Sequence, residues 1–264
     1  MLIKLLKYDL KYMLKNMSVF YILSLFFAIT TRLLSLPEQT IMLDILGKIS
    51  SGCVIAMIAN IVINTMMRSW IRFKESLYKD ESYLTHTLPV TKSDIYNSKF
   101  IQTLIFFLIG FAVVLLSLFT AYYTPDAWTT IKEYIRTITI GFNMSTTFFV
   151  SIAVIVIFLE LFNTIQCGFL GIILGYKRNS GKEGFSVLYG FIIYLVAQTL
   201  VLGLVFAYGL FDPTVMELFK TGTISIDVNA FKTLAIIASI LYVVIILSMS
   251  VICKRVLRKG VNVE

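Results

Sequence analysis

The sequence predicts an all-α protein that crosses a membrane six times. Hydrophobic residues make up 58% of the 264 residues and charged residues only 14%, so a soluble core of this size would lack the polar surface to cover it. Six apolar runs come close to or exceed the roughly 20 residues that a helix needs to cross a bilayer. The predicted spans are residues 18–36, 49–67, 100–123, 137–159, 184–211 and 233–253, and only the first contains a charged residue, Arg32.

The amino-terminal residues 1–16 are predicted to form an amphipathic helix on the inner membrane surface, ahead of the first span. Lysines follow one side of this helix and apolar residues the other, a pattern typical of an interfacial helix. The apolar residues are Leu2, Ile3, Leu5, Leu6, Leu10, Met13 and Leu14. No small-residue cleavage site follows, so we interpret 18–36 as a retained span rather than a signal peptide.

The basic residues predict that both termini lie in the cytoplasm. With the amino terminus inside, 17 of the 23 Lys and Arg residues fall in inner segments, in agreement with the positive-inside rule. This asymmetry and contact with anionic lipid head groups account for the net charge of +8, so we expect no nucleic-acid partner. The inner basic residues are Lys4, Lys7, Lys11, Lys15, Arg68, Arg72, Lys74, Lys79, Lys92, Lys99, Lys177, Arg178, Lys182, Lys254, Arg255, Arg258 and Lys259.

The region 137–176 is the hardest to divide into spans, because its 40 residues contain a single charged residue, Glu160. One helix of this length would measure about 60 Å, roughly twice the apolar thickness of a bilayer. Two crossings would place the basic loop 177–182 outside, against the charge distribution. We therefore predict one crossing near 144–166 with a helical overhang. Three glycines in the overhang permit close helix contact or a bend: Gly168, Gly171 and Gly175.

Two further outer connections are predicted, a short one after the first span and a longer one after the fifth. Pro37 ends the first span, and Asp44 and Lys48, four residues apart, are expected to pair at the start of the second. Residues 212–230 are interpreted as an extracellular loop, in which the alternating "TISIDV" predicts a short strand.

The sequence indicates no catalytic, metal or cofactor site in this chain. The loop "GYKRNSGKEG" differs from a phosphate-binding loop, because Gly175 and Gly181 are one residue too far apart and Glu183 replaces the residue that coordinates magnesium. The three cysteines lie in apolar runs without CxxC spacing, and we interpret them as packing residues: Cys53, Cys167 and Cys253.

The polar segment 68–99 is predicted to be a cytoplasmic insert with secondary structure of its own. Its apolar residues are spaced to cover an apolar surface, while the charged residues between them stay solvated. Pro89 breaks this element, and Thr91 is placed to cap a new helix that begins at Lys92, with Asp94 in capping-box position. That helix is predicted to continue without a break into the third span. The spaced apolar residues are Phe73, Leu77, Leu84 and Leu88.

Within this segment, "DESYLTHTLPVTKSDIYNSKF" resembles the inter-span element of permease subunits in the ABC-2 family of type-2 ABC exporters. In that family a D-E-G-Y-L-T-x-T-L-P-like run precedes a helix that leads into the third span; Ser82 stands here where Gly is usual. The amphipathic start, the six spans and the basic tail "CKRVLRKG" are similar to the family over essentially the whole chain. The motif is typical of low-GC Gram-positive members, among them exporters of bacteriocins and toxin peptides.

The resemblance implies that the element is a coupling helix, which docks in a groove of a separate ATP-binding subunit. The residues that would make this contact are Tyr83, Leu84, Thr85, His86, Thr87, Leu88 and Pro89. It also implies a multi-pass protein of the bacterial plasma membrane, formed of one permease domain over 1–264. This permease would work as a dimer, with a second copy or a different permease, together with two ATP-binding subunits that bind ATP and magnesium. The expected cargo is amphiphilic: an antimicrobial or toxin peptide, a drug or a lipid-like molecule.

Two groups of polar residues inside the spans are candidates for the translocation pathway. On the second span, Asn60, Asn64 and Arg68 recur every four residues and share one face. On the fourth span, a similar face is formed by Glu160, Asn163, Thr164 and Cys167. Polar groups in a bilayer face the bundle or a wet cavity, so they either line a path or form hydrogen bonds between helices.

Three other classes of protein were weighed against the exporter permease. An intramembrane enzyme needs a catalytic group of residues within the spans, whereas the only histidine, His86, lies in a loop and Glu160 has no second carboxylate near it. An ion-coupled secondary transporter is disfavoured by the single intramembrane carboxylate and the lack of inverted repeats. A membrane immunity or sensor protein stays open, and such a role can coexist with export.

Overall fold

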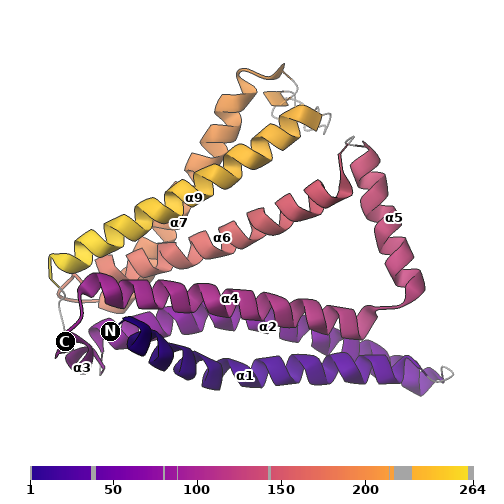
Figure 1. The fold of residues 1–264 in the computed structure, drawn as a ribbon, viewed down its shortest axis with the longest axis horizontal. Helices are drawn as coiled ribbons and strands as arrows, with labels where there is room; N and C mark the ends of the chain where they lie inside the picture. Colours follow the sequence, from indigo (N-terminus) through magenta and orange to yellow (C-terminus); the bar gives the residue numbers. More distant parts are fainter. Residues whose placement is uncertain are drawn as a thin grey trace. The chain divides into compact units, whose positions relative to one another are not determined.

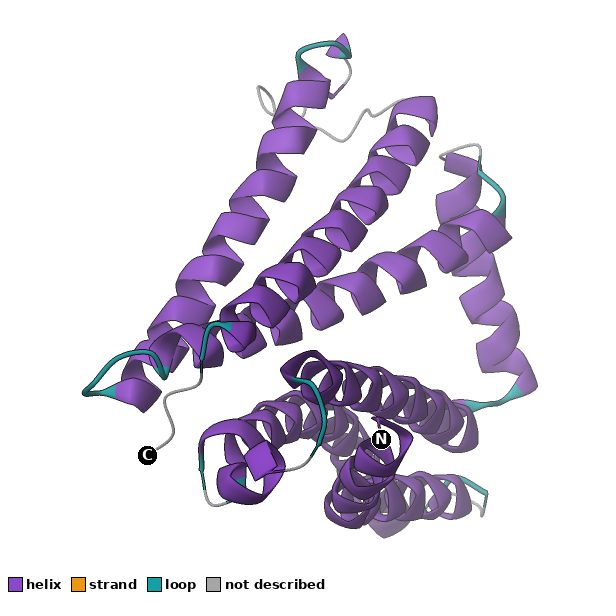
Figure 2. Ribbon diagram, turned by 60° about the vertical axis from the view of Figure 1, so that its left-hand side comes forward, coloured by secondary structure: helices purple, strands orange, loops and turns teal. Residues whose placement is uncertain are grey.

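The computed structural model describes residues 2–36, 40–79, 81–87, 89–141, 144–213, 215–216 and 228–260. Within these residues the regular secondary structure is entirely helical (Figures 1 and 2). The helices are α1 (Leu2–Leu34), α2 (Ile41–Tyr78), α3 (Ser82–Thr87), α4 (Lys92–Tyr122), α5 (Pro125–Gly141), α6 (Thr146–Gly175), α7 (Lys182–Gly209) and α9 (Val228–Arg258).

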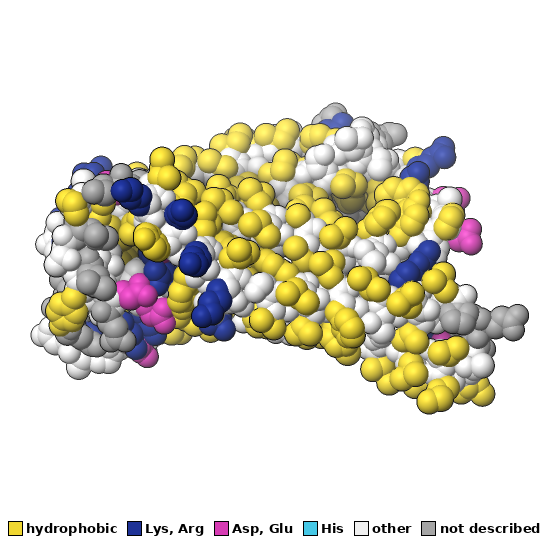
Figure 3. Space-filling model, turned by 60° about the horizontal axis from the view of Figure 1, so that its bottom comes forward, with side chains coloured by type: hydrophobic (Ala, Val, Ile, Leu, Met, Phe, Trp, Pro, Cys, Tyr) yellow, Lys and Arg dark blue, Asp and Glu magenta, His cyan; other side chains and the backbone are white. Residues whose placement is uncertain are grey.

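Six of these helices are long and apolar enough to cross a membrane: α1, α2, α4, α6, α7 and α9. The prediction of six long apolar helices in an all-helical fold is thereby confirmed for the described residues. Many large apolar side chains on these helices are exposed, which is expected of surfaces that face lipid. On the face seen in Figure 3, apolar side chains cover most of the surface, and the charged side chains gather toward its two ends.

Three helix boundaries differ from the sequence prediction. The helix α2 continues unbroken to Tyr78, so Phe73 and Leu77 of the predicted insert belong to this long helix and not to a separate element. Residues 2–16 are not a separate helix but the first half of α1, which continues unbroken to Leu34. Their apolar side includes Met13, which is fully buried against other helices instead of being turned outward. The region 137–176 contains one span, α6, as predicted, but its first residues belong to an additional helix, α5.

The chain, treated above as one permease domain, falls into two compact units, over residues 1–130 and 131–262. In the first unit α1 packs against α2 and α4, and in the second α6 packs against α7 and α9. Figures 1 and 2 both show α1, α2 and α4 running side by side. The predicted loop 212–230, with its "TISIDV" strand, lies largely outside the described residues.

The helices of the first unit are joined by small apolar contacts and by hydroxyl hydrogen bonds. Ser24 Oγ donates to Ser117 Oγ at 2.9 Å and so links α1 to α4. Thr31 and Ser50 share a 2.9 Å hydroxyl hydrogen bond that links α1 to α2. Such bonds are expected between membrane helices, because lipid offers no competing partner. The buried cluster beside them contains Met13, Met17, Tyr21, Ile61 and Phe106.

The second unit depends on close backbone contact between α6 and α7. A Cβ atom added at Gly171 would lie 2.5 Å from the backbone nitrogen of Gly190 and 2.6 Å from the carbonyl oxygen of Ser186. At Gly175 it would collide with Ser186. The glycines of the predicted overhang therefore permit close helix contact, as one of the two sequence alternatives proposed.

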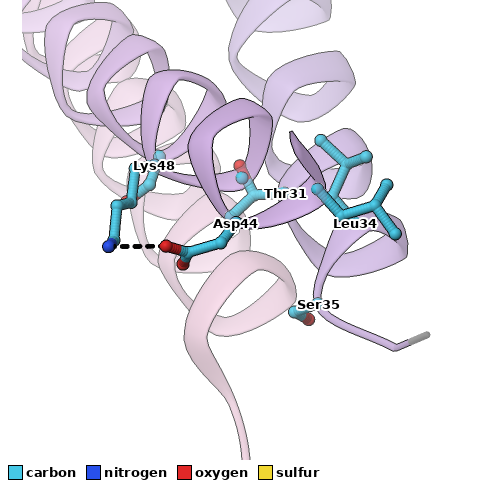
Figure 4. Close-up of a pocket in the computed structure, with 8 residues that line it drawn as sticks. Thr31, Leu34, Ser35, Asp44 and Lys48 are labelled. Atoms are coloured by element: carbon cyan, nitrogen blue, oxygen red, sulfur yellow. Dashed lines mark hydrogen bonds and ion pairs between the residues drawn. The ribbon is translucent and has the colours of Figure 1, made fainter. Parts of the chain in front are cut away.

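A small hollow of about 150 Å³ lies in the first unit between the end of α1 and the start of α2 (Figure 4). On its rim Lys48 Nζ bonds Asp44 Oδ2 at 2.7 Å, which confirms the predicted pair. The Lys48 side chain is 76% exposed and that of Asp44 40%, and their charges neutralise each other. Such a pair contributes little to stability, about 0.3–0.5 kcal/mol, and it serves below as a reference for buried pairs.

Candidate functional site

The segment between α2 and α4 contains the short helix α3 (Ser82–Thr87), at the place where the sequence predicts a docking element. The restart of the chain after Pro89 is confirmed. Thr91 Oγ1 accepts a hydrogen bond from the backbone N–H of Asp94 at 3.2 Å and donates one to the Asp94 carboxylate at 2.8 Å. From this cap α4 runs as one helix from Lys92 to Tyr122, so α3 is separated from a span by only a few residues.

Beneath this segment lies a buried cluster of charges that joins three helices of the first unit. Asp9 of α1 is the central residue: its Oδ1 accepts from Arg72 Nε of α2 at 3.0 Å and from Lys99 Nζ of α4 at 2.5 Å. Its Oδ2 accepts from Ser98 Oγ of α4 at 3.0 Å. Asp9 and Lys99 are 1% and 2% exposed, so these charges are almost entirely shielded from solvent.

Because the charges of this cluster are buried, they must stay paired with one another. A charge in the protein interior is tolerated only when it is paired and hydrogen-bonded, because the desolvation cost is several kcal/mol per ion. Asp9 uses both oxygens and pairs with both buried cations, and Glu81 is a second carboxylate for Arg72. The ends of α1, α2 and α4 are therefore fixed together at this level of the unit.

The cluster extends to α3 through Arg72. Its Nη1 donates to Glu81 Oε2 at 2.6 Å, and the guanidinium lies 4.5 Å above the centre of the Tyr12 ring. Tyr12 donates in turn to Glu75 Oε2 of α2 at 3.0 Å. Glu81 directly precedes α3, and its carbonyl oxygen accepts the hydroxyl hydrogen of Thr85 at 2.9 Å. The first turn of α3 is thus tied to the buried charges.

The residues predicted to contact an ATP-binding subunit differ in accessibility. Tyr83 is 66% exposed, and Thr87 and Pro89 are also exposed. Thr85 is 7% exposed and faces the unit, so its side chain supports α3 and does not present a contact surface. The side chains of Leu84 and His86, and all of Leu88, lie outside the described residues.

Sequence reasoning missed the buried cluster. Arg72 and Lys99 were counted only for orientation, and Asp9 was not singled out. A signal was present, since Asp9 is the only acidic residue among the first 37 and stands within a lysine-rich helix. It could not identify the partners, because these are 63 and 90 positions away along the chain.

A second polar group lies inside the second unit, around Glu160 of α6. Glu160 Oε1 accepts from Gln198 Nε2 at 2.7 Å and from the Tyr194 hydroxyl at 3.1 Å, both on α7. The Tyr242 hydroxyl of α9 donates to Gln198 Oε1 at 3.5 Å, so three helices meet here. Among the described residues Glu160 Oε2 is buried and has no hydrogen-bond partner.

The other polar residues predicted to line a path form only local bonds. Asn60 donates to the carbonyl of Ala56, and Asn64 donates to the carbonyl of Asn60, all within α2. Thr164 donates to the Glu160 carbonyl within α6. Asn163 is fully buried next to Cys167, whose sulfur lies 3.9 Å from Asn163 Oδ1.

In the part of the chain that the structure describes, no three His, Cys, Asp or Glu side chains lie close enough together to hold a metal ion. Comparison of the chain with protein-family models, with curated proteins and with solved structures found no match. The functional assignment therefore rests on the residues and on their geometry.

Proposed function

We propose that this chain is the membrane-spanning permease subunit of an ATP-driven ABC-2 exporter, and that the segment 83–89, through residues other than the buried Thr85, forms the surface on which a separate ATP-binding subunit docks. The observation that supports this most directly is a short helix with an exposed tyrosine, tied through Glu81 to buried charges shared by three helices. A solvated loop would need no such attachment. The resemblance of "DESYLTHTLP" to the ABC-2 docking element supplies the identity of the partner.

The geometry suits mechanical coupling. A force applied to α3 by two closing ATPase subunits would pass through Arg72 into α2 and through the capped restart at Thr91 into α4. Because the buried cluster resists separation of these helices, they would tilt together instead of sliding independently. Such a rigid-body tilt exchanges inward-facing and outward-facing states and so moves an amphiphilic cargo outward.

Both termini and α3 are placed on the cytoplasmic side of a bacterial plasma membrane in this proposal, in line with the bias of Lys and Arg. Cysteines introduced at Val90 or Ser180 should therefore resist an impermeant thiol reagent in intact cells, whereas one at Asp126 should react. Reaction at position 180 from outside would contradict this orientation.

The docking proposal is tested by purifying the tagged chain in mild detergent and measuring the bound ATP-binding subunit and ATP hydrolysis. Tyr83→Asp should reduce the amount of bound subunit about tenfold or more, because exposed aromatic residues often dominate interfaces and tenfold corresponds to roughly 1.4 kcal/mol. Thr129→Asp, which places the same charge at an exposed position of α5, is the control and should behave as wild type. Undiminished association of Tyr83→Asp would contradict the assignment.

A further inference from the structure

We propose that α5 (Pro125–Gly141) lies in the membrane–water interface with its apolar face inserted among the lipids, on the side of the membrane opposite α3. This inference depends on the chain being a membrane protein and is independent of whether it works with an ATPase. It goes beyond the sequence prediction, in which residues 124–136 were part of a connection and 137 began a span.

The residue pattern of α5 is that of an interfacial helix. At 100° per residue, its apolar side chains other than Pro125 and Ile140 fall on one side, and its charged residues and most of its threonines fall on the other. The separation is stronger than in any of the six long helices. The apolar face consists of Ala127, Trp128, Ile131, Tyr134, Ile135 and Ile138.

This face is exposed in the described structure. Ile131 is 47% exposed, Ile138 44% and Tyr134 69%, and no described helix packs along the length of α5. Leaving such side chains in water would be unfavourable by about 1.5–3 kcal/mol each when fully exposed. The face therefore needs an occupant.

The chain connections keep α5 close to the membrane surface. Only Tyr123 and Thr124 separate the end of α4 from the start of α5, and an extended chain covers at most about 3.5 Å per residue. At the other end, the four residues 142–145 separate α5 from α6. Because α4 and α6 both cross the membrane, each end of α5 lies within a short reach of the bilayer surface.

The surface next to α5 indicates that lipid covers its apolar face. Phe119 near the end of α4 stacks on Tyr123 with a 4.4 Å centroid separation, and Tyr123 lies 6.4 Å from the ring of Trp128. All three rings are partly exposed, so an aromatic strip continues from the lipid-facing side of a span onto α5. Trp and Tyr are enriched at the level of the lipid head groups.

Charge indicates how α5 would bind. Its four charged residues, Asp126, Lys132, Glu133 and Arg136, sum to zero, so attraction to anionic lipid is not the driving force. Binding should instead follow the apolar area and should persist at high salt.

The test uses the full chain in lipid vesicles, with its three native cysteines replaced by alanine and single spin labels placed along α5. The accessibility of each label to oxygen, which enters lipid, and to a water-soluble nickel complex is then measured. Labels at 131, 134, 135 and 138 should favour oxygen, and labels at 129, 130, 133 and 137 should favour nickel. The ratio should oscillate with the 3.6-residue helical period and should not change with salt.

Two results would overturn the proposal. Nickel access at all eight positions would show a helix in water, and shielding of the apolar positions from both reagents would show a protein contact, such as a second copy of the chain. A second measurement uses the variant Trp70→Phe, in which α5 is unchanged and Trp128 is the only tryptophan. Lipids brominated near the head group should quench its fluorescence more strongly than lipids brominated near the chain end, and the reverse order or no quenching would also contradict the proposal.

Discussion

The two units differ in how their buried polar side chains are paired. In the first unit the buried Asp9 pairs with the cations Arg72 and Lys99 within hydrogen-bond distance, and Arg72 also pairs with Glu81. In the second unit a single carboxyl group, Glu160, is held by the neutral donors Gln198 and Tyr194. Close helix contact there comes from glycine, whereas in the first unit it is accompanied by serine and threonine bonds.

This difference indicates that charge pairing stabilises the first unit and neutral hydrogen bonds stabilise the second. Paired charges hold α1, α2 and α4 together next to α3, which is what the proposed coupling to an ATP-binding subunit would require. The carboxyl group of the second unit has no cationic partner among the described residues, so its contribution depends on hydrogen bonds and not on charge pairing. The predictions below set these two arrangements against each other, beginning with the largest expected effect.

Asp9→Asn should produce the largest loss of stability. It removes the carboxylate that pairs with the buried Lys99 and leaves Arg72 with Glu81 alone, and breaking a buried pair from one side costs about 3–5 kcal/mol. Thermal denaturation of the purified protein should show a strongly lowered midpoint. Asp44→Asn is the matched control: it breaks the exposed pair with Lys48 and should cost at most about 0.5 kcal/mol.

A second variant separates charge from packing in this cluster. Adding Lys99→Met to Asp9→Asn removes the cation whose carboxylate partner was lost and should recover part of the lost stability. Equal midpoints for Asp9→Asn and Asp44→Asn would show that the buried cluster does not stabilise the unit.

Gly171→Ala should have the next largest effect, because it tests packing in the second unit. The new methyl group would meet backbone atoms of Gly190 and Ser186 that cannot rotate away, so α6 and α7 must separate, at a cost of about 1–3 kcal/mol. Gly203→Ala on α7 is the control, since no atom lies within 4 Å of its added Cβ. It should be neutral or stabilising by up to about 1 kcal/mol. A stable Gly171→Ala protein would contradict the close helix contact.

Glu160 variants should have the smallest effect on stability. Glu160→Gln keeps an oxygen that accepts from Gln198 and Tyr194, so its midpoint should stay near that of wild type. Glu160→Leu removes the acceptor from both donors and should cost about 1–2 kcal/mol, given the modest worth of hydrogen bonds in membranes.

The same pair of variants tests a role in the translocation pathway. If Glu160 attracts a cationic or amphipathic cargo, Glu160→Gln should lower cargo-stimulated ATP hydrolysis in liposomes and leave basal hydrolysis intact. If several cargos stimulate ATP hydrolysis by Glu160→Gln as strongly as by wild type, Glu160 has only a structural role.

The sequence was sufficient for features that depend on local pattern. Apolar run length predicted the six spans, and the order Pro89, Thr91, Asp94 predicted the capped start of α4. The four-residue spacing of Asp44 and Lys48 predicted their pair. These features follow from helical geometry alone, so they need no information on distant contacts.

Other features could not be predicted because they depend on long-range contacts or on an ambiguous boundary. The partners of Asp9 and of Glu160 come from other helices, and periodicity does not identify them. Residues 137–141 were assigned to a span since they continue an apolar run, yet they end α5. The local signals at this boundary are Gly141, the last residue of α5, and Ser145, whose hydroxyl accepts from the N–H of Phe148 at the start of α6, and neither outweighed the apolar run in the sequence prediction.

The central claim is that residues 83–89 touch an ATP-binding subunit, and photo-crosslinking from position 83 tests it most directly. A benzophenone amino acid would replace the exposed Tyr83, the native membranes would be irradiated, and the crosslinked protein would be identified by mass spectrometry. We predict a product that joins the chain to a subunit with a nucleotide-binding motif, and no such product from the same probe at position 129. Crosslinks from position 83 only to lipid, or to a protein without a nucleotide-binding motif, would contradict the account.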